Sequence, residues 1–144
     1  LVIAGNNASP ELMASAKRYK HISLFTKNRF ISGVEKKISA DEIYELIKTS
    51  QINILPTFQT TGLKLKLLAA IYIGRHCIVN SQMVINTGLE SLCHIADSPY
   101  QMKKIIQELM QKPLNKDEIV KREKILGEKF SNKKNVRKMI ELIF

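Results

Sequence analysis

The chain has 144 residues, 44% of them hydrophobic, which is enough for one domain with a core and too short for two ordinary domains. The longest strictly apolar run, from Leu67 to Ile73, is far shorter than the roughly 18 residues that a membrane-spanning helix needs, and two cysteines are too few for a disulfide scaffold. A net charge of +10 suits anionic partners, whether phosphates, acidic lipid headgroups or nucleic acid.

Five short apolar runs are the expected strands of a sheet. They are mostly continuous and do not alternate with polar residues, which is typical of strands buried on both faces. Strands of this kind form parallel sheets that helices cover. The runs are Leu1 to Ala4, Ile22 to Phe25, Ile52 to Leu55, Cys77 to Val79 and Leu92 to Ala96.

Helical segments with clear start signals lie between these runs. Ser9 can cap a helix whose first turn holds Pro10 and Glu11, and residues 39–42 have the spacing of a capping box. Residues 98–101 repeat this pattern before a further helix. The alternation predicts an α/β fold: a doubly wound, Rossmann-like parallel sheet of about five or six strands with helices on both faces.

A long polar loop is expected after the second run. Thr26, Lys27 and Asn28 begin it beyond the carboxyl end of a strand, where the ligands of open parallel sheets bind. We therefore include all three as candidate binding residues. A solvated basic loop is the alternative.

The chain is organised around the stretch from Leu55 to Gly74, which the apolar run at Ile52 to Leu55 leads into. A short strand ends before a proline, a polar loop follows, and a helix is expected from Gly62 to Gly74, with Gly74 as a left-handed helix stop. This helix is apolar on nearly every side except at Lys64 and Lys66. We therefore expect it to be buried between a sheet and a further layer.

The start of this helix is a candidate anion site. The first backbone N–H groups of a helix have no intrahelical partner and lie at the positive end of its dipole. Gly62 lets a phosphate approach the backbone, Thr61 offers a hydroxyl, and Lys64 and Lys66 add positive charge. An ordinary connection between strand and helix, with solvated lysines, is the alternative.

The pairs His76-Cys77 and Cys93-His94 contain zinc-ligand residue types. Adjacent strand residues point to opposite faces, so each pair can offer only one ligand to a given side. Two ligands are fewer than the three protein ligands of a catalytic zinc site. We therefore predict packed core residues, with no metal site and no cofactor.

Two helical segments of mixed charge are expected near the end of the chain, at Lys116 to Gly127 and at Asn132 to Phe144. Each carries an apolar stripe, and we interpret the charges between as solvated faces. The stripes are Ile119, Ile125 and Leu126 on the first segment, and Val136, Met139, Ile140 and Ile143 on the second.

The stretch from Ile52 to Ser81 resembles the nucleotide-sugar signature of retaining glycosyltransferases with the two-domain GT-B architecture, of the glycosyl transferases group 1 type. The shared pattern is a strand ending in proline, a glycine-containing phosphate loop, a helix, and a glycine followed by another strand. The segments that begin at Leu1, His21 and Gly88 resemble further parts of that family's donor-binding domain.

This resemblance implies a hexosyltransferase-type enzyme that takes a nucleoside-diphosphate sugar as donor and a glycan, polysaccharide or lipid-linked acceptor. Backbone N–H groups of Gly62, Leu63 and Lys64 would contact the diphosphate. Lys64 or Lys66 would offset charge on the departing nucleoside diphosphate, and Thr61 would contact the sugar. The loop at residues 26–28 would contact the base.

The family's paired glutamates fall on Thr61 and Ala69, and neither residue is acidic. We therefore assign no catalytic residue and expect the chain alone to bind the donor without turnover. A noncatalytic nucleotide- or partner-binding module of similar fold, which lost these glutamates, is the alternative function. A nucleic-acid-binding domain is disfavoured, because the positive charge is spread along the chain without a recognition motif.

The expected organisation is a single Rossmann-like nucleotide-sugar-binding domain over residues 1–144, with its core at 1–112 and C-terminal helices at 113–144. We expect an N-terminal acceptor domain and a first βα unit to precede it in a longer polypeptide. In the family's strand order, 3-2-1-4-5-6, the run at Leu1 is the second strand, so a central strand is missing.

The strand edges beside this gap would be exposed. Another copy of the chain, direct contact between the flanking strands or an upstream βα unit would cover them, and we favour the upstream unit. We expect a cytoplasmic protein, with acidic headgroups at the inner face of the membrane as a further contact.

Overall fold

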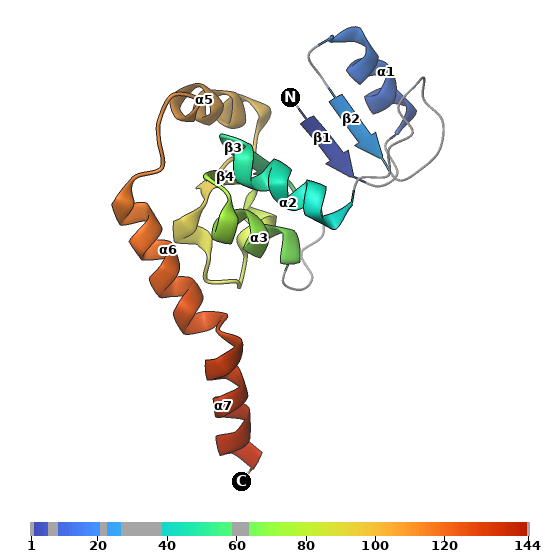
Figure 1. Ribbon diagram of the computed structural model, residues 1–144. Coiled ribbons are helices and arrows are strands. Elements are labelled where there is room, and N and C mark those ends of the chain that lie inside the picture. The colour runs from blue at the N-terminus through green and yellow to red at the C-terminus, as the bar shows by residue number, and fades with distance from the viewer. Residues whose placement is uncertain (1, 6–8, 21–22, 27–38, 59–63, 144) are drawn as a thin grey trace. The chain divides into compact units, whose positions relative to one another are not determined.

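The computed structural model describes residues 2–5, 9–20, 23–26, 39–58 and 64–143. The chain divides into two compact units, Leu1–Ile43 and Tyr44–Phe144, and Figure 1 labels most of their elements. Each unit contains helices and parallel strands, so the predicted α/β class is confirmed.

The first unit contains a strand, a helix and a second strand parallel to the first. The elements are β1 (Val2–Gly5), α1 (Pro10–Arg18) and β2 (Ser23–Thr26). Helix α1 begins where the sequence predicts, because the Ser9 hydroxyl accepts a hydrogen bond from the Leu12 N–H at 3.2 Å.

Helix α2 (Ala40–Thr49) has the predicted capping box. The Ser39 N–H donates to the Glu42 carboxylate at 2.8 Å, and the Glu42 N–H donates to the Ser39 hydroxyl at 3.1 Å. These reciprocal bonds satisfy backbone donors that the start of a helix otherwise leaves without a partner.

The second unit is built on a parallel sheet in the order β3-β4-β5. Ile78 on β4 lies opposite His94 on β5, so residues 76, 78 and 94 share one face of the sheet. The elements are β3 (Ile52–Leu55), α3 (Leu65–Ile73), β4 (His76–Val79), α4 (Ser81–Val84), the 3-10 turn η1 (Glu90–Leu92), β5 (His94–Ile95) and α5 (Pro99–Leu109). The strand predicted at residues 92–96 is therefore shorter, because Leu92 belongs to η1.

Apolar clusters lie on both faces of this sheet. We call them the α3 face and the α5 face, after the helix that covers each. On the α3 face the buried residues are Leu67, Ala70, Ile71, Cys77, Val79, Met83, Val84, Leu89, Leu92 and Leu126. On the α5 face Ile78, Ala96 and Leu109 are buried, with Ile52, Ile54, Met102, Ile105 and Ile106 half-buried around them.

Helix α3 packs between the sheet and a later helix, α6 (Lys116–Lys129), as predicted. The predicted bounds are wrong at its start, because the helix begins at Leu65 with Lys64 at the N-cap position. The predicted left-handed stop is also wrong, since Gly74 has φ −84° and ψ 173°, which is extended backbone. Glycine is required there for space: a Cβ would lie 2.5 Å from the Ala70 carbonyl oxygen and 2.6 Å from Asn53 Nδ2.

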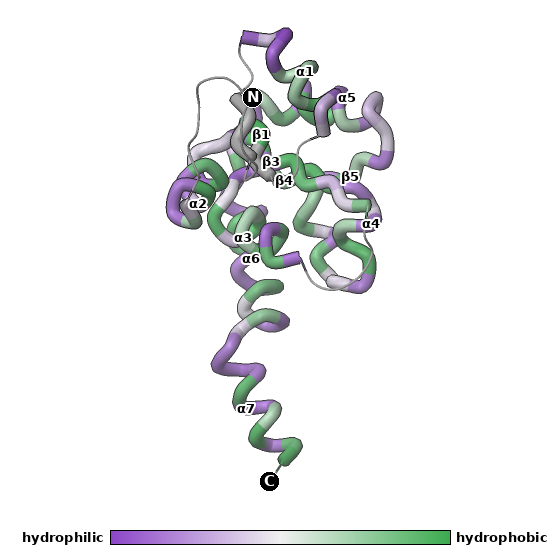
Figure 2. The backbone as a smooth tube through the Cα atoms, turned by 90° about the vertical axis from the view of Figure 1, so that its right-hand side faces the viewer, coloured by the Kyte–Doolittle hydropathy of each residue, from purple (hydrophilic) through white to green (hydrophobic). Residues whose placement is uncertain are grey.

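Helices α6 (Lys116–Lys129) and α7 (Asn132–Ile143) follow the predicted C-terminal segments. Leu126 of α6 is buried on the α3 face. The described residues of α7 are all exposed, including its predicted apolar stripe, and Figure 2 shows hydrophobic and hydrophilic residues interspersed along this helix. Among the described residues, no helix has the length and apolarity to cross a membrane.

All five apolar runs form strands: the first four lie within one residue of the predicted bounds, and the last is two residues shorter at its start and one at its end. The described strands nevertheless form two sheets, β1-β2 and β3-β4-β5, in place of one continuous sheet of five or six strands.

Candidate functional site

Polar groups gather where β3 and β4 end. The Thr57 N–H donates to Asn80 Oδ1 at 3.0 Å, and Asn80 Nδ2 donates to the Thr57 carbonyl oxygen at 2.6 Å. Asn80 follows β4 directly, and Thr57 follows β3 by two residues. This reciprocal pair therefore holds the loop after β3 beside the end of β4.

Asp97 follows β5 and lies at the same edge of the sheet, where it contacts the residue that begins α4. Its carboxylate oxygens accept hydrogen bonds from the Ser81 N–H at 2.7 Å and the Ser81 hydroxyl at 2.6 Å. The Ser81 hydroxyl, followed by the Ser81 N–H, holds the pKa of the Asp97 carboxyl below its ordinary value. Asp97 thereby caps the first turn of α4.

The start of α3 lies toward this carboxyl edge. Since β3 and β4 are parallel, the chain between them must run back along the sheet, and α3 ends just before β4. Lys64 occupies the N-cap position, where an ammonium has no acceptor with which to cap the first N–H groups. Lys66 in the first turn is exposed, and that turn carries no acidic residue. This helix end is therefore electropositive.

Lys64 and Lys66 are the predicted phosphate-site residues that the structure describes. Thr26 is the last residue of β2, so the prediction that it begins a loop is wrong. The other predicted nucleotide-sugar contacts lie outside the described residues; they are Lys27, Asn28, Thr61, Gly62 and Leu63.

Ala69 is the residue on which the family's second glutamate falls in the predicted resemblance. It is half-buried on α3 and lines a shallow groove of about 560 Å³ together with Tyr44 and Glu45 of α2.

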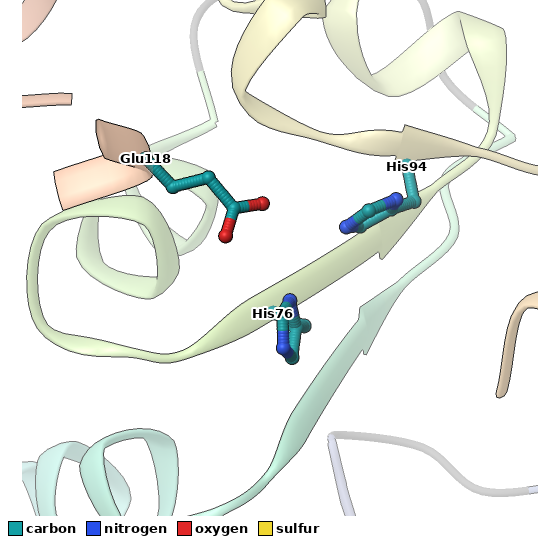
Figure 3. A group of neighbouring side chains, drawn as sticks. All are labelled: His76, His94 and Glu118. Atoms are coloured by element: carbon teal, nitrogen blue, oxygen red, sulfur yellow. The ribbon is translucent and has the colours of Figure 1, made fainter. Parts of the chain in front are cut away.

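A second polar cluster lies at the amino edge of the same sheet. It contains His76, the first residue of β4, His94, the first residue of β5, and Glu118 from the first turn of α6. One potential ligand atom of each residue lies within 4.8 Å of those of the other two. Figure 3 shows the two rings and the carboxylate turned toward a common space. These are residue types that hold a metal ion.

The hydrogen bond of His76 defines its tautomer. His76 Nε2 lies 2.7 Å from the carbonyl oxygen of Lys112, and because a carbonyl can only accept, Nε2 carries the hydrogen. In a neutral ring Nδ1 then holds a lone pair. Nδ1 is buried, and it has no hydrogen-bond partner within the described part of the chain. The Gln51 side chain donates to the same Lys112 oxygen at 2.8 Å and holds it in place.

The surroundings of His94 keep its ring neutral. Burial lowers the pKa of His94, the nearby His76 lowers it further, and Glu118 opposes both. The imidazole therefore offers a lone pair at neutral pH. Glu118 is held by a capping box: its Oε2 accepts from the Asn115 N–H at 3.1 Å, and its own N–H donates to Asn115 Oδ1 at 2.7 Å.

The prediction that neighbouring strand residues face opposite sides is confirmed. Cys77 is buried on the α3 face, whereas His76 lies on the face that α5 covers. Because only ligands from the strands were considered, the sequence predicted two potential metal ligands on each face of the sheet. Glu118, the third residue of the cluster, was missed because its signal in the sequence is that of a capping residue.

A cavity of about 1220 Å³ lies between the end of α3, the segment joining α5 to α6, and α6 itself. Its walls are mostly apolar and include Leu68, Ile71, Tyr72, Met110, Ile119, Leu126 and Phe130. Arg122 also lines it, but its guanidinium donates to the carbonyl oxygens of Gly74, at 2.9 Å, and Arg75. This charge therefore stabilises the end of α3.

The two polar clusters lie at opposite ends of the same strands. The carboxyl edge offers an electropositive helix start, which suits an anion, and the amino edge offers two imidazoles and a carboxylate, which suit a cation. No family model matches the chain, and neither the curated proteins nor the solved structures give a match.

Proposed function

We propose that the chain is the donor-binding domain of a glycosyltransferase, of the GT-B type that residues 52–81 resemble, and that it binds a nucleoside-diphosphate sugar. The observation that carries this proposal is the start of α3, an electropositive helix end at the carboxyl edge of a parallel sheet. Diphosphates bind at such positions, because unpaired backbone N–H groups and the helix dipole favour an anion.

The strand pairing supports the complete doubly wound sheet that this proposal requires. In the order 3-2-1-4-5-6, β1 and β2 would be the second and third strands, and β3, β4 and β5 the last three. β1 pairs with β2, and β3, β4 and β5 are neighbours in succession, as that order demands. A preceding βα unit would supply the strand between β1 and β3. The start of α3 would then lie at the switch point, where the ligands of such sheets bind.

Within the proposed site, backbone N–H groups of Gly62, Leu63 and Lys64 bind the diphosphate. Lys66 offsets the charge of the departing nucleoside diphosphate, and Thr61 contacts the sugar. The base contacts the loop that begins after β2. The net charge of +10 favours the same anionic donor and an acidic membrane surface at the cytoplasmic side.

The acceptor comes from an N-terminal domain in the proposed whole enzyme. Helix α7 supports this assembly, because Val136, Met139 and Ile140 are exposed on one side of it. A partner domain that packed against this stripe would remove its apolar surface from water.

Titration calorimetry with a panel of nucleoside diphosphates and nucleotide sugars tests the proposal. Gly62→Val should abolish binding while the circular dichroism spectrum stays unchanged, because the added side chain blocks the approach of the phosphate. Lys66→Ala should weaken binding about tenfold through the loss of a charge-assisted contact. Lys104→Ala removes an exposed lysine of α5 and is the matched control, with affinity unchanged within about twofold.

Unchanged affinity in a folded Gly62→Val variant would refute the phosphate site. The noncatalytic module is the second candidate, favoured by Thr61 and Ala69 at the positions of the family's glutamates. Binding of nucleoside diphosphates without any preference for a sugar would support that module over the donor-binding domain.

A further inference from the structure

We propose that His76, His94 and Glu118 bind a divalent transition-metal ion of the zinc class. The three side chains come from β4, β5 and α6, and one potential ligand atom of each lies within 4.8 Å of the others (Figure 3). Two imidazoles with one carboxylate form a donor set that binds zinc with three protein ligands, and the same set also suits iron(II). The site lies at the amino edge of the sheet, away from the proposed nucleotide site.

His76 has the environment of a metal ligand. A histidine that binds a metal through one ring nitrogen usually donates its other N–H to a carbonyl or carboxylate, which fixes the tautomer and the ring orientation. His76 donates through Nε2 to the Lys112 carbonyl at 2.7 Å. Its Nδ1, fully buried, finds no hydrogen-bond partner among the described residues. A bound cation would satisfy this lone pair.

Glu118 is oriented by the start of its own helix. One oxygen, Oε2, accepts the Asn115 N–H at 3.1 Å, and a carboxylate has further acceptor sites on its other oxygen. The capping box therefore holds the carboxylate at the start of α6 and still allows it to bind a metal ion. This is the arrangement in which a hydrogen-bonded ligand is preorganised for its ion.

Binding of an ion requires a small contraction of the cluster. A tetrahedral zinc ion with bonds of about 2.0–2.1 Å holds its ligand atoms about 3.4 Å apart. Ligand atoms that are as much as 4.8 Å apart must therefore approach by up to about 1.4 Å. His94 and Glu118 are half-buried and can rotate toward the ion, whereas the hydrogen bond to Lys112 holds His76.

The bound ion would connect elements that are distant in sequence. It would join the first residues of β4 and β5 to the first turn of α6, and thereby fasten α6 to the sheet. With three protein ligands, a fourth position stays open to water. We therefore expect metal binding to raise the thermal stability of the second unit.

The test uses the full chain, stripped of metal with a chelator and kept reduced with a phosphine. Calorimetric titration with Zn²⁺ should show one equivalent bound and a raised Tm. Glu118→Gln removes the carboxylate but keeps a capping residue, and His94→Asn removes one imidazole at a half-buried position. Each should weaken Zn²⁺ binding at least tenfold. Asp117→Asn removes the same charge from the same turn at an exposed position, and its affinity should stay within about twofold of the original.

Cobalt spectroscopy separates this site from the cysteines. Co²⁺ bound to His76, His94 and Glu118 should give ligand-field bands without a thiolate charge-transfer band. Two results would overturn the proposal: no saturable binding of Zn²⁺ to the folded chain, or binding that persists in both ligand variants with a thiolate band, which would assign the ion to Cys77 or Cys93.

Discussion

The two faces of the β3-β4-β5 sheet carry different chemistry, although the same strands build both. On the α3 face, Cys77 and Val79 pack among buried apolar side chains of α3, α4 and α6. On the α5 face, His76 lies beside His94, with ring centroids 5.7 Å apart. Because successive strand residues point to opposite faces, the pairs His76-Cys77 and Cys93-His94 place thiols on one face and imidazoles on the other.

The thiol of Cys77 and the imidazole of His76 therefore have different roles: the thiol packs in the core, and the imidazole can bind a ligand. A hydrogen bond with Cys93, together with burial, raises the pKa of the Cys77 thiol, so Cys77 stays protonated and acts as a small apolar residue. On the opposite face, His76 keeps a buried nitrogen for which the described residues supply no hydrogen. A side chain packed in apolar contacts, such as Cys77, stabilises the fold, whereas a buried acceptor for which the described residues supply no donor, such as Nδ1 of His76, can take a ligand.

The largest expected effect concerns the buried cluster on the α3 face. Leu67→Ala should lower the free energy of unfolding by about 3 kcal/mol, because Leu67 is fully buried and the substitution leaves a cavity. Met102→Ala should cost about half as much, because Met102 on the α5 face is only half-buried. Urea unfolding of the two variants measures both values. Equal losses of unfolding free energy in the two variants would show that the two faces contribute equally to stability.

The next effect concerns Arg122, a buried cation at the edge of the α3 face. Its guanidinium donates to the carbonyl oxygens of Gly74 and Arg75, at the negative end of the α3 dipole. Arg122→Met keeps most of the apolar stem and leaves these oxygens without that donor, which should cost about 2 kcal/mol in urea unfolding. Lys124→Met, at an exposed position of the same helix, is the control and should change stability by a few tenths of a kcal/mol. A similar loss in both variants would contradict the capping role.

Arg122 and Glu118 make contacts that could not be predicted from the sequence. The strands and the caps at Ser9, Ser39 and Ser98 could be predicted because each depends on a few consecutive residues. Arg122 reaches the end of α3 from far along the chain, and Glu118 reaches two histidines in the same way. Such contacts depend on how helices pack, and a pattern of local residues does not contain that information.

Gly74 shows a second physical reason why part of the structure could not be predicted from the sequence. The sequence identified a glycine that ends a helix, but the same residue type serves positive φ and close approach equally well. Here the nearby Ala70 carbonyl oxygen and Asn53 amide leave no room for a Cβ. The residue type could be interpreted correctly only with its neighbours in view.

His76→Leu should have a smaller effect than either core substitution above. It removes one hydrogen bond to the Lys112 carbonyl, which keeps Gln51 as a donor, and it also removes the unsatisfied Nδ1. With similar volume, the variant should change the free energy of unfolding in metal-free buffer by less than about 1 kcal/mol. The stabilisation by Zn²⁺ should disappear at the same time. A loss above about 2 kcal/mol without metal would show that His76 is mainly a structural residue.

The smallest expected effect is at the carboxyl edge, where polar groups are satisfied by each other. Two hydrogen bonds from Ser81 hold the pKa of the exposed Asp97 carboxyl below its ordinary value. A carboxyl whose pKa is lower in the folded state stabilises the fold above the unfolded-state pKa, and this contribution is lost as the pH falls through the folded-state pKa. Asp97→Asn should therefore be slightly less stable than the original chain at neutral pH, and the difference should vanish in acid. Urea unfolding of both proteins across the acidic range measures it. A difference that stays constant with pH would show that the hydrogen-bond geometry, and not the charge of Asp97, stabilises the first turn of α4.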